Sequence, residues 1–229
     1  MFKKSTGLFI VIALLIVLKC AYAEPDAVET IKYNISPIGH SEYQDFGMVN
    51  FLGKKLKLVT FWTDVLGFCD LEKIYIDPKT LLPVFVERDL KIWMDKEYLT
   101  EDYDQKNFNL AITKFKNKKK VDEYLYDADG PIHNAVFMPF YVRTVREFKP
   151  GWSLEARFPG KFKVQLAGIE EVEVPAGKFK AYHFTSEPNK FEIWITADKA
   201  RIPVKIKGCG GLNYTLEMSE YFPNGKNHK

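Results

Sequence analysis

The sequence contains four histidines, and their positions give no local sign of a catalytic or metal-binding site. No two of them are two or four residues apart, the spacings that place both imidazoles on one face of a strand or a helix. The motif Gly-x-Ser-x-Gly, which exposes a nucleophilic serine in many hydrolases, is absent. We therefore predict no catalytic residue, no metal ligand and no cofactor, and a protein that is not an enzyme. The histidines are His40, His133, His183 and His228.

Paired carboxyl groups can act as acid and nucleophile in glycoside hydrolysis, and two acidic clusters raise that alternative. Both clusters fall in strand-like or turn-like sequence, so we expect their side chains to lie on exposed strand faces and turns. A hydrolase acting on envelope polymers is therefore kept as a third functional alternative. The clusters are Glu101, Asp102 and Asp104, and Glu170, Glu171 and Glu173.

Cys69 and Cys209 are far apart in the sequence and do not form a close-spaced pair of metal ligands. In an oxidising compartment they could close a disulfide across a long loop, for which chain-entropy models give about 5 kcal/mol of stabilisation. The alternative is two buried free thiols, which pack as small hydrophobic side chains. The sequence leaves both alternatives open.

The N-terminus has the three parts of a secretory signal peptide. Two lysines are followed by an uncharged, mostly apolar run at residues 7–18 and by small residues before Glu24. This order predicts cleavage between Ala23 and Glu24. A membrane anchor is the alternative, but a spanning helix needs about 20 apolar residues, and this run stops at Lys19. Lipidation at Cys20 is disfavoured because the bulky Lys19 precedes it.

Export predicts a protein of the periplasm or cell envelope that is soluble after signal removal, since no later stretch is apolar enough to span a bilayer. The chain has 33 basic and 30 acidic residues, and the signal removes Lys3, Lys4 and Lys19. The mature chain is thus close to neutral, which excludes the broad positive field that nucleic-acid binding relies on.

The elements that must position any site are mostly strands. Apolar residues alternate with polar ones over residues 31–35 and 55–62, and tight turns separate neighbouring runs, as at residues 77–80. Such strands pair antiparallel. Only residues 132–141 show helix-like spacing, and Pro139 limits them to one or two short turns. This pattern predicts one mainly β domain at residues 24–222 and a flexible tail at residues 223–229.

Four stretches in this order resemble the bacterial exported family catalogued as domain of unknown function 3108. They are residues 74–88, the aromatic segment ending in Tyr141-Val142-Arg143, the turn Val174-Pro175-Ala176-Gly177, and the hairpin from Trp194 through Asp198 to Arg201-Ile202-Pro203-Val204. The resemblance implies an exported protein built as a single curved antiparallel sheet or half-barrel of hairpins. It implies no reaction.

Two noncatalytic functions fit such a sheet. The first is binding of an apolar small molecule or lipid, or of a lipid-modified partner, on an aromatic concave face that residues 132–141 cover as a plug. The second is a structural or protein-interaction domain with a filled core, in which the same segment caps the core and a surface patch or edge strand engages an envelope protein. The predicted ligand-binding residues are Trp62, Phe137, Phe140, Tyr141, Trp152 and Trp194.

Overall fold

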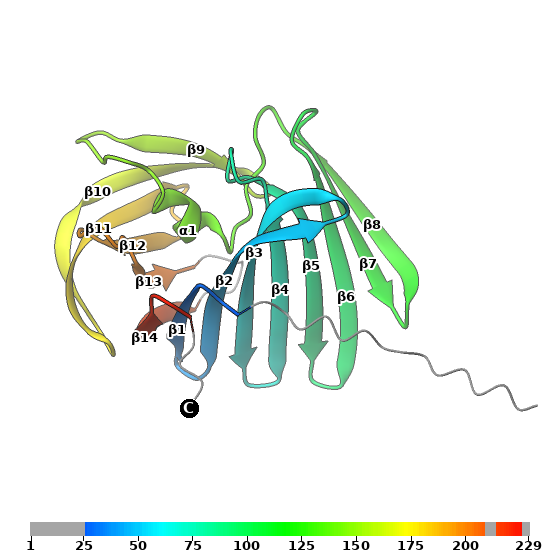
Figure 1. Cartoon of the computed structure of the whole chain (residues 1–229), viewed down its shortest axis with the longest axis horizontal. Coiled ribbons are helices and arrows are strands. Elements are labelled where there is room, and N and C mark those ends of the chain that lie inside the picture. The colour runs from blue at the N-terminus through cyan, green and yellow to red at the C-terminus, as the bar shows by residue number, and fades with distance from the viewer. Residues whose placement is uncertain (1–25, 209–213, 226–229) are drawn as a thin grey trace, which may run out of the picture.

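The computed structural model describes residues 26–208 and 214–225. They form one antiparallel sheet of 14 strands and one short helix, which confirms the predicted mainly β fold (Figure 1). The elements are β1 (Glu29–Ser36), β2 (His40–Phe51), β3 (Lys54–Val65), β4 (Phe68–Ile76), β5 (Pro83–Ile92), β6 (Asp95–Asp104), β7 (Asn109–Lys116), β8 (Lys119–Asp127), α1 (Met138–Val142), β9 (Ser153–Arg157), β10 (Lys161–Val174), β11 (Gly177–Glu187), β12 (Glu192–Thr196), β13 (Pro203–Lys207) and β14 (Thr215–Phe222).

The sheet consists of two meanders joined side by side. Strands β1 to β8 pair in sequence order, as do β9 to β14, and β1 pairs with β14 to make the sheet continuous. Strands β8 and β9 therefore lie at its two ends. The chain passes from one to the other through residues 128–152, here called the crossover segment, which contains α1.

Alternation of side chains between two faces explains which residues form the core. In β1, Ile31, Tyr33 and Ile35 are buried, while Asn34 between them is exposed. The predicted turn at residues 77–80 is also present, because the Asp77 carboxylate accepts the backbone N–H groups that follow it.

The crossover segment fills the inner side of the curved sheet. Figure 1 shows α1 inside the curve of the second meander, and its residues Met138, Phe140 and Val142 are buried in the main core. The Phe140 ring stacks on Tyr43 of β2 with a centroid distance of 3.7 Å. Helix α1 therefore packs as part of the core and fills the concave side where it lies.

The tip of the β2–β3 hairpin forms a second, smaller core on the outer face. A bulge at Gly47, which has a φ of +67°, redirects β2. Beyond the bulge, Phe51 stacks on Tyr75 of β4 at 3.8 Å and on Phe85 of β5 at 5.4 Å. In Figure 1 this hairpin bends across the first meander.

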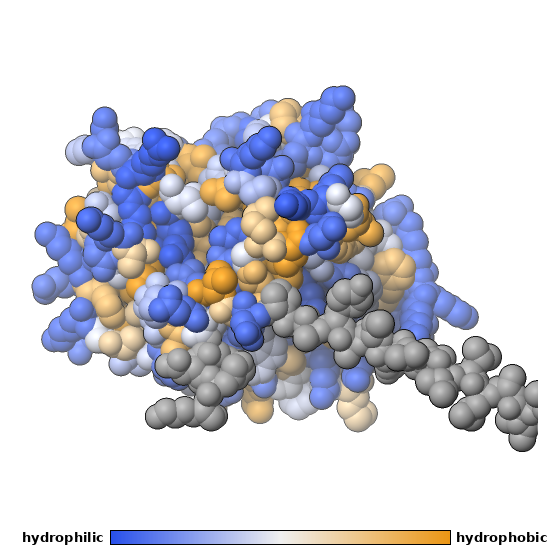
Figure 2. All heavy atoms as spheres, in the orientation of Figure 1, coloured by the Kyte–Doolittle hydropathy of each residue, from blue (hydrophilic) through white to orange (hydrophobic). Residues whose placement is uncertain are grey.

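The face shown in Figure 2 is mostly hydrophilic, with hydrophobic residues gathered toward its middle. Every residue of the end strand β8 except Tyr126 is exposed. Over the described ranges, none of the helical structure is long and apolar enough to cross a membrane.

Candidate functional site

The six aromatic residues predicted to bind a ligand do not form one pocket. Phe137 and Phe140 are buried in the core, and Tyr141 packs partly buried against it. Trp152 also packs on the core, where its ring lies 5.5 Å from that of Phe184. These four side chains fill the inner face of the sheet.

Trp62 and Trp194 point to the outer side of their strands, but Trp194 is only 8% exposed and still belongs to the main core cluster. Their strand neighbours Phe61 and Ile193 belong to the inner core, and adjacent strand residues point to opposite faces. The Trp194 ring stacks on His183 at 4.3 Å, and its Nε1 donates to Glu170 Oε1 at 2.6 Å.

A cavity of about 290 Å³ remains on the inner face between the first meander and the crossover segment. We call it the Glu72 cavity. Strands β4 to β7 form one wall, and the start of the crossover segment and the β9–β10 turn form the other. Its lining residues are Glu72, Arg88, Glu101, Tyr103, Leu110, Ile112, His133, Asn134, Ala135, Val136, Phe158 and Pro159.

Strand register brings the charged groups of this cavity together. Glu72 of β4 is directly opposite Arg88 of β5, and the Arg88 Nε lies 3.2 Å from Glu72 Oε1. Arg88 also donates through Nε and Nη2 to Asp70, two residues before Glu72 on the same face. Glu101 of β6 is paired with the β5 residue two positions before Arg88, and it accepts a hydrogen bond from the Tyr103 hydroxyl at 2.5 Å. Three carboxyl groups thus surround one guanidinium group.

Burial shifts the protonation of these acids. The Glu72 side chain is 4% exposed, and burial raises its pKa to about 8 even though Arg88 acts in the opposite direction. Burial also raises the pKa of Glu101 above its usual value. With three carboxyl groups around one guanidinium group, the cluster has more acidic than basic side chains.

Hydrogen bonds hold the crossover segment over this cluster. Gln105 donates to the Ile132 carbonyl at 2.7 Å and accepts the Ile132 N–H at 3.1 Å. Asn134 accepts the Phe137 N–H at 2.9 Å, and its side chain also hydrogen-bonds Glu72. The entry into α1 is therefore fixed to the β6–β7 turn.

His133 lies in the same cavity as a neutral imidazole. Burial, with a smaller contribution from the Arg157 charge, lowers its pKa to about 4. Its Nδ1 accepts the Arg157 backbone N–H at 3.4 Å, and its ring meets Tyr141 edge-on at 5.0 Å. A base this weak is poorly matched to proton abstraction near neutral pH.

The remaining lining is apolar. Leu110 and Ile112 of β7 face Val136, Phe158 and Pro159 across the cavity. The cavity therefore has one charged, hydrogen-bonding side and one apolar side, which suits an amphipathic ligand.

Sequence reasoning missed Glu72 and was wrong about Glu101. The acidic cluster around Glu101 was predicted to be exposed, and Asp102 and Asp104 are, but Glu101 is 9% exposed because it shares the inner face with Tyr103. The other cluster, residues 170–173, is exposed at its three glutamates, as predicted. A signal for Glu72 was present, because it occupies the same alternating face as Ile74 and Ile76.

Other predicted features lie partly outside the described residues. Cys69 is half-buried on β4, but Cys209 falls outside the described ranges, so the disulfide stays a prediction. The predicted cleavage point between Ala23 and Glu24 also falls outside them. Across residues 26–208 and 214–225, no three His, Cys, Asp or Glu side chains are grouped to hold a metal ion.

The sheet and its cavity define a β-barrel-like protein, an open curved antiparallel sheet that wraps around its own crossover segment. Residues 49–217 match the family described as Protein of unknown function (DUF3108). The chain belongs to this family, as the resemblance predicted.

One solved structure with the same fold is a β-barrel-like protein of domain of unknown function DUF1849 from Brucella abortus. It shares 7% sequence identity, with a TM-score of 0.52 over 89% of this chain and 99% of that chain. A search of curated proteins gave no match.

Proposed function

We propose that this is an exported, noncatalytic binding protein of the cell envelope that holds a small amphipathic ligand in the Glu72 cavity. The ligand carries an ammonium-like cationic group, which lies against Glu72 and Glu101. Its apolar part lies against Leu110, Ile112 and Phe158. The proposal refines the predicted apolar ligand by giving it a charged end.

The charge balance of the cavity carries this proposal. Arg88 is shared by Asp70 and Glu72, and among the described residues Glu101 forms no ion pair of its own, although the Tyr103 hydroxyl donates to it. A ligand cation would supply the missing charge and favour ionisation of Glu72. The apolar opposite wall supports an aliphatic or aromatic body, and about 290 Å³ is at the lower end of ligand pockets, about 300–1,000 Å³.

Calorimetric titration with hexylamine, hexanol and hexanoate tests the proposal. We expect hexylamine to bind at least about tenfold more tightly than the other two, since only it pairs with the carboxyl groups. Glu72 must lose a proton when the amine binds. The binding enthalpy at pH 7 should therefore depend on the ionisation enthalpy of the buffer.

Glu72→Gln should reduce both the preference for the amine and the proton release, because the amide cannot ionise and only Glu101 remains to pair with the amine. Glu171→Gln, an exposed substitution on β10, is the matched control and should change neither. Equal binding of hexylamine and hexanol, or an enthalpy that is the same in every buffer, would refute the proposed role of Glu72.

A hydrolase is the second candidate, because the raised pKa of Glu72 is what a general acid needs near neutral pH. The low pKa of His133 and the engagement of Asp70 by Arg88 disfavour it. Mass spectrometry of ligands recovered after incubation separates the two functions. A binding protein returns the ligands intact, whereas a hydrolase converts them to products. The Glu72→Gln variant should no longer form those products.

A further inference from the structure

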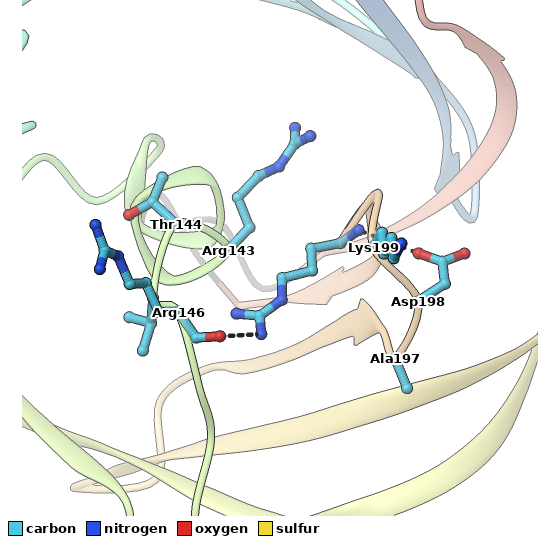
Figure 3. Close-up of a pocket in the computed structure, with 8 residues that line it drawn as sticks. Arg143, Thr144, Arg146, Ala197, Asp198 and Lys199 are labelled. Carbon is cyan, nitrogen blue, oxygen red and sulfur yellow. Dashed lines mark hydrogen bonds between the residues drawn. The ribbon is translucent and has the colours of Figure 1, made fainter.

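A second, basic cleft lies at the other end of α1 from the Glu72 cavity. Two turns form it: residues 143–146, which follow α1, and residues 197–201, which connect β12 to β13. Figure 3 shows these turns facing each other, with Arg143 and Arg146 on one side and Lys199 and Asp198 on the other. The cleft has a volume of about 500 Å³ and is open to solvent.

Four basic side chains and one acidic side chain line this cleft. Arg143 is neutralised by Glu29, to which it donates through both Nη atoms at 2.9 Å. The Asp198 carboxylate is occupied within its own turn, where it accepts the Thr196 hydroxyl at 2.7 Å and the N–H of Ala200 at 3.0 Å.

Arg146 and Lys199 are exposed, and within the described part of the chain neither forms an ion pair. Together with Arg201 they leave the cleft with a net positive charge. Such a cluster attracts anions, and a bound anion reduces the repulsion between its positive charges.

Arg201 supplies an unfilled hydrogen bond at the floor of the cleft. Its Nη2 donates to the Arg146 carbonyl at 2.6 Å, drawn as a dashed line in Figure 3, and its guanidinium group lies 4.8 Å above the Phe148 ring. Its Nη1 is buried and has no partner among the described residues. A buried donor without an acceptor is costly, so a rotation of the guanidinium group that brings Nη1 to an acceptor in the cleft would be stabilising.

We propose that this cleft binds a phosphoryl group, carried either by a small soluble phosphate ester or by an anionic lipid headgroup. The Arg201 guanidinium group rotates so that Nη1 donates to one phosphoryl oxygen. The exposed Arg146 side chain, which points away from Lys199 in Figure 3, swings over the cleft, and Arg146 and Lys199 contact the other oxygens. Guanidinium groups match phosphate oxygens in geometry and form strong charge-assisted hydrogen bonds with them. Several separate donors suit a group with three free oxygens better than a single carboxylate.

Titration with glycerol 3-phosphate at constant ionic strength tests this site. The double variant Arg146→Gln/Lys199→Gln should raise the dissociation constant at least about tenfold, since two charge-assisted contacts are lost. The matched control is Lys54→Gln/Lys55→Gln, which removes two exposed charges from β3 and should leave the dissociation constant within about twofold. Equal weakening in both variants would overturn the proposal, as would the absence of binding both to glycerol 3-phosphate at millimolar concentration and to phosphatidylglycerol vesicles.

Flotation with vesicles separates the two sources of the phosphoryl group. Binding to phosphatidylglycerol vesicles but not to phosphatidylcholine vesicles, lost in Arg146→Gln/Lys199→Gln, assigns the cleft to lipid headgroups. Binding of glycerol 3-phosphate without vesicle binding assigns it to soluble esters. Glu72→Gln should leave both results unchanged, because Glu72 does not line this cleft.

Discussion

Glu72 and His133 line one cavity, yet their pKa values move in opposite directions. Burial raises the pKa of Glu72 to about 8 and lowers that of His133 to about 4. In both cases burial disfavours the charged form. Both side chains are therefore mainly neutral between pH 5 and 7, which leaves Arg88 and Asp70 as the ion pair of the site.

The stability of the protein should consequently fall as the pH rises from 6.5 to 8. Over this range the folded state holds the Glu72 proton, while the unfolded chain, with a glutamate pKa near 4.5, does not. Folding therefore binds a proton, and the free energy of unfolding decreases by at most about 1.4 kcal/mol per pH unit for one such group. The raised pKa of Glu101 gives a slope of the same sign at pH values between its unfolded and folded pKa.

Urea unfolding at several pH values measures this slope. Glu72→Gln should reduce the slope between pH 6.5 and 8, whereas the exposed control Glu171→Gln should retain it. Below pH 6.5, protonation of the unfolded His133 opposes the Glu72 effect, because the folded pKa of His133 is lower. A slope that Glu72→Gln does not alter would mean that Glu72 is ionised in the folded protein.

Core residues were easier to identify from sequence patterns than the residues that line the cavity. Phe137 and Phe140 were predicted to face the inside of the sheet, and they do, but as packed core. Hydrophobicity cannot distinguish a side chain that lines a cavity from one that fills it. Alternation with Ile74 and Ile76 indicates that Glu72 faces inward, but the cavity around it depends on Arg88 and on the crossover segment, which no local pattern specifies.

At the scale of elements, α1 is the part of the crossover segment that ties the two meanders together. Its five residues include Phe140, which contacts Tyr43 and Phe61 of the first meander, and the helix also approaches β13 of the second. Pro139 lies in the first turn, where its missing N–H breaks no helical hydrogen bond. The predicted one or two helical turns are thus present.

Phe140→Ala should destabilise the fold by about 3–5 kcal/mol, the usual cost of removing a buried phenyl group. Its ring is 2% exposed and loses stacking with Tyr43 in addition to hydrophobic burial. Urea unfolding monitored by circular dichroism measures the change. Leu125→Ala, on the exposed β8, is the control and should change stability by less than about 0.5 kcal/mol. Similar losses in both variants would contradict a packed α1.

Hairpins were the most predictable elements, because their turns carry local chemistry. The Asp104 carboxylate accepts the N–H groups of Lys106 and Asn107, as Asp77 does in its own turn. The pairing of β1 with β14 had no such signal. It joins Ile31 to Tyr221, and no periodicity within either segment specifies a partner so distant in the sequence.

For the whole molecule, a single core cluster spans both meanders. It contains Val59 and Ile74 of the first meander and Ile193 and Ile206 of the second. Strand β1 also reaches across through the Tyr33 hydroxyl, which donates to the Pro203 carbonyl at 2.8 Å. Contacts this extensive predict that the two meanders unfold together.

Hydrogen exchange of the native protein tests this cooperativity. The most protected amides of β4 and of β12 should open with the same free energy, and Phe140→Ala should lower both by the same amount. Leu125→Ala should lower neither. Protection that survives in one meander while it is lost in the other would show two independent units.

The strand order also constrains how the chain acquires its structure as it is made. Strands β1 to β8 each pair with the strand just before or after them, so hairpins can form as soon as they are synthesised. One side of β1, by contrast, has no neighbour until β14, the last strand of the described residues, is complete. Until β14 has been made, a nascent chain therefore carries unsatisfied backbone donors and acceptors along β1, the kind of surface on which chaperones act and aggregates begin.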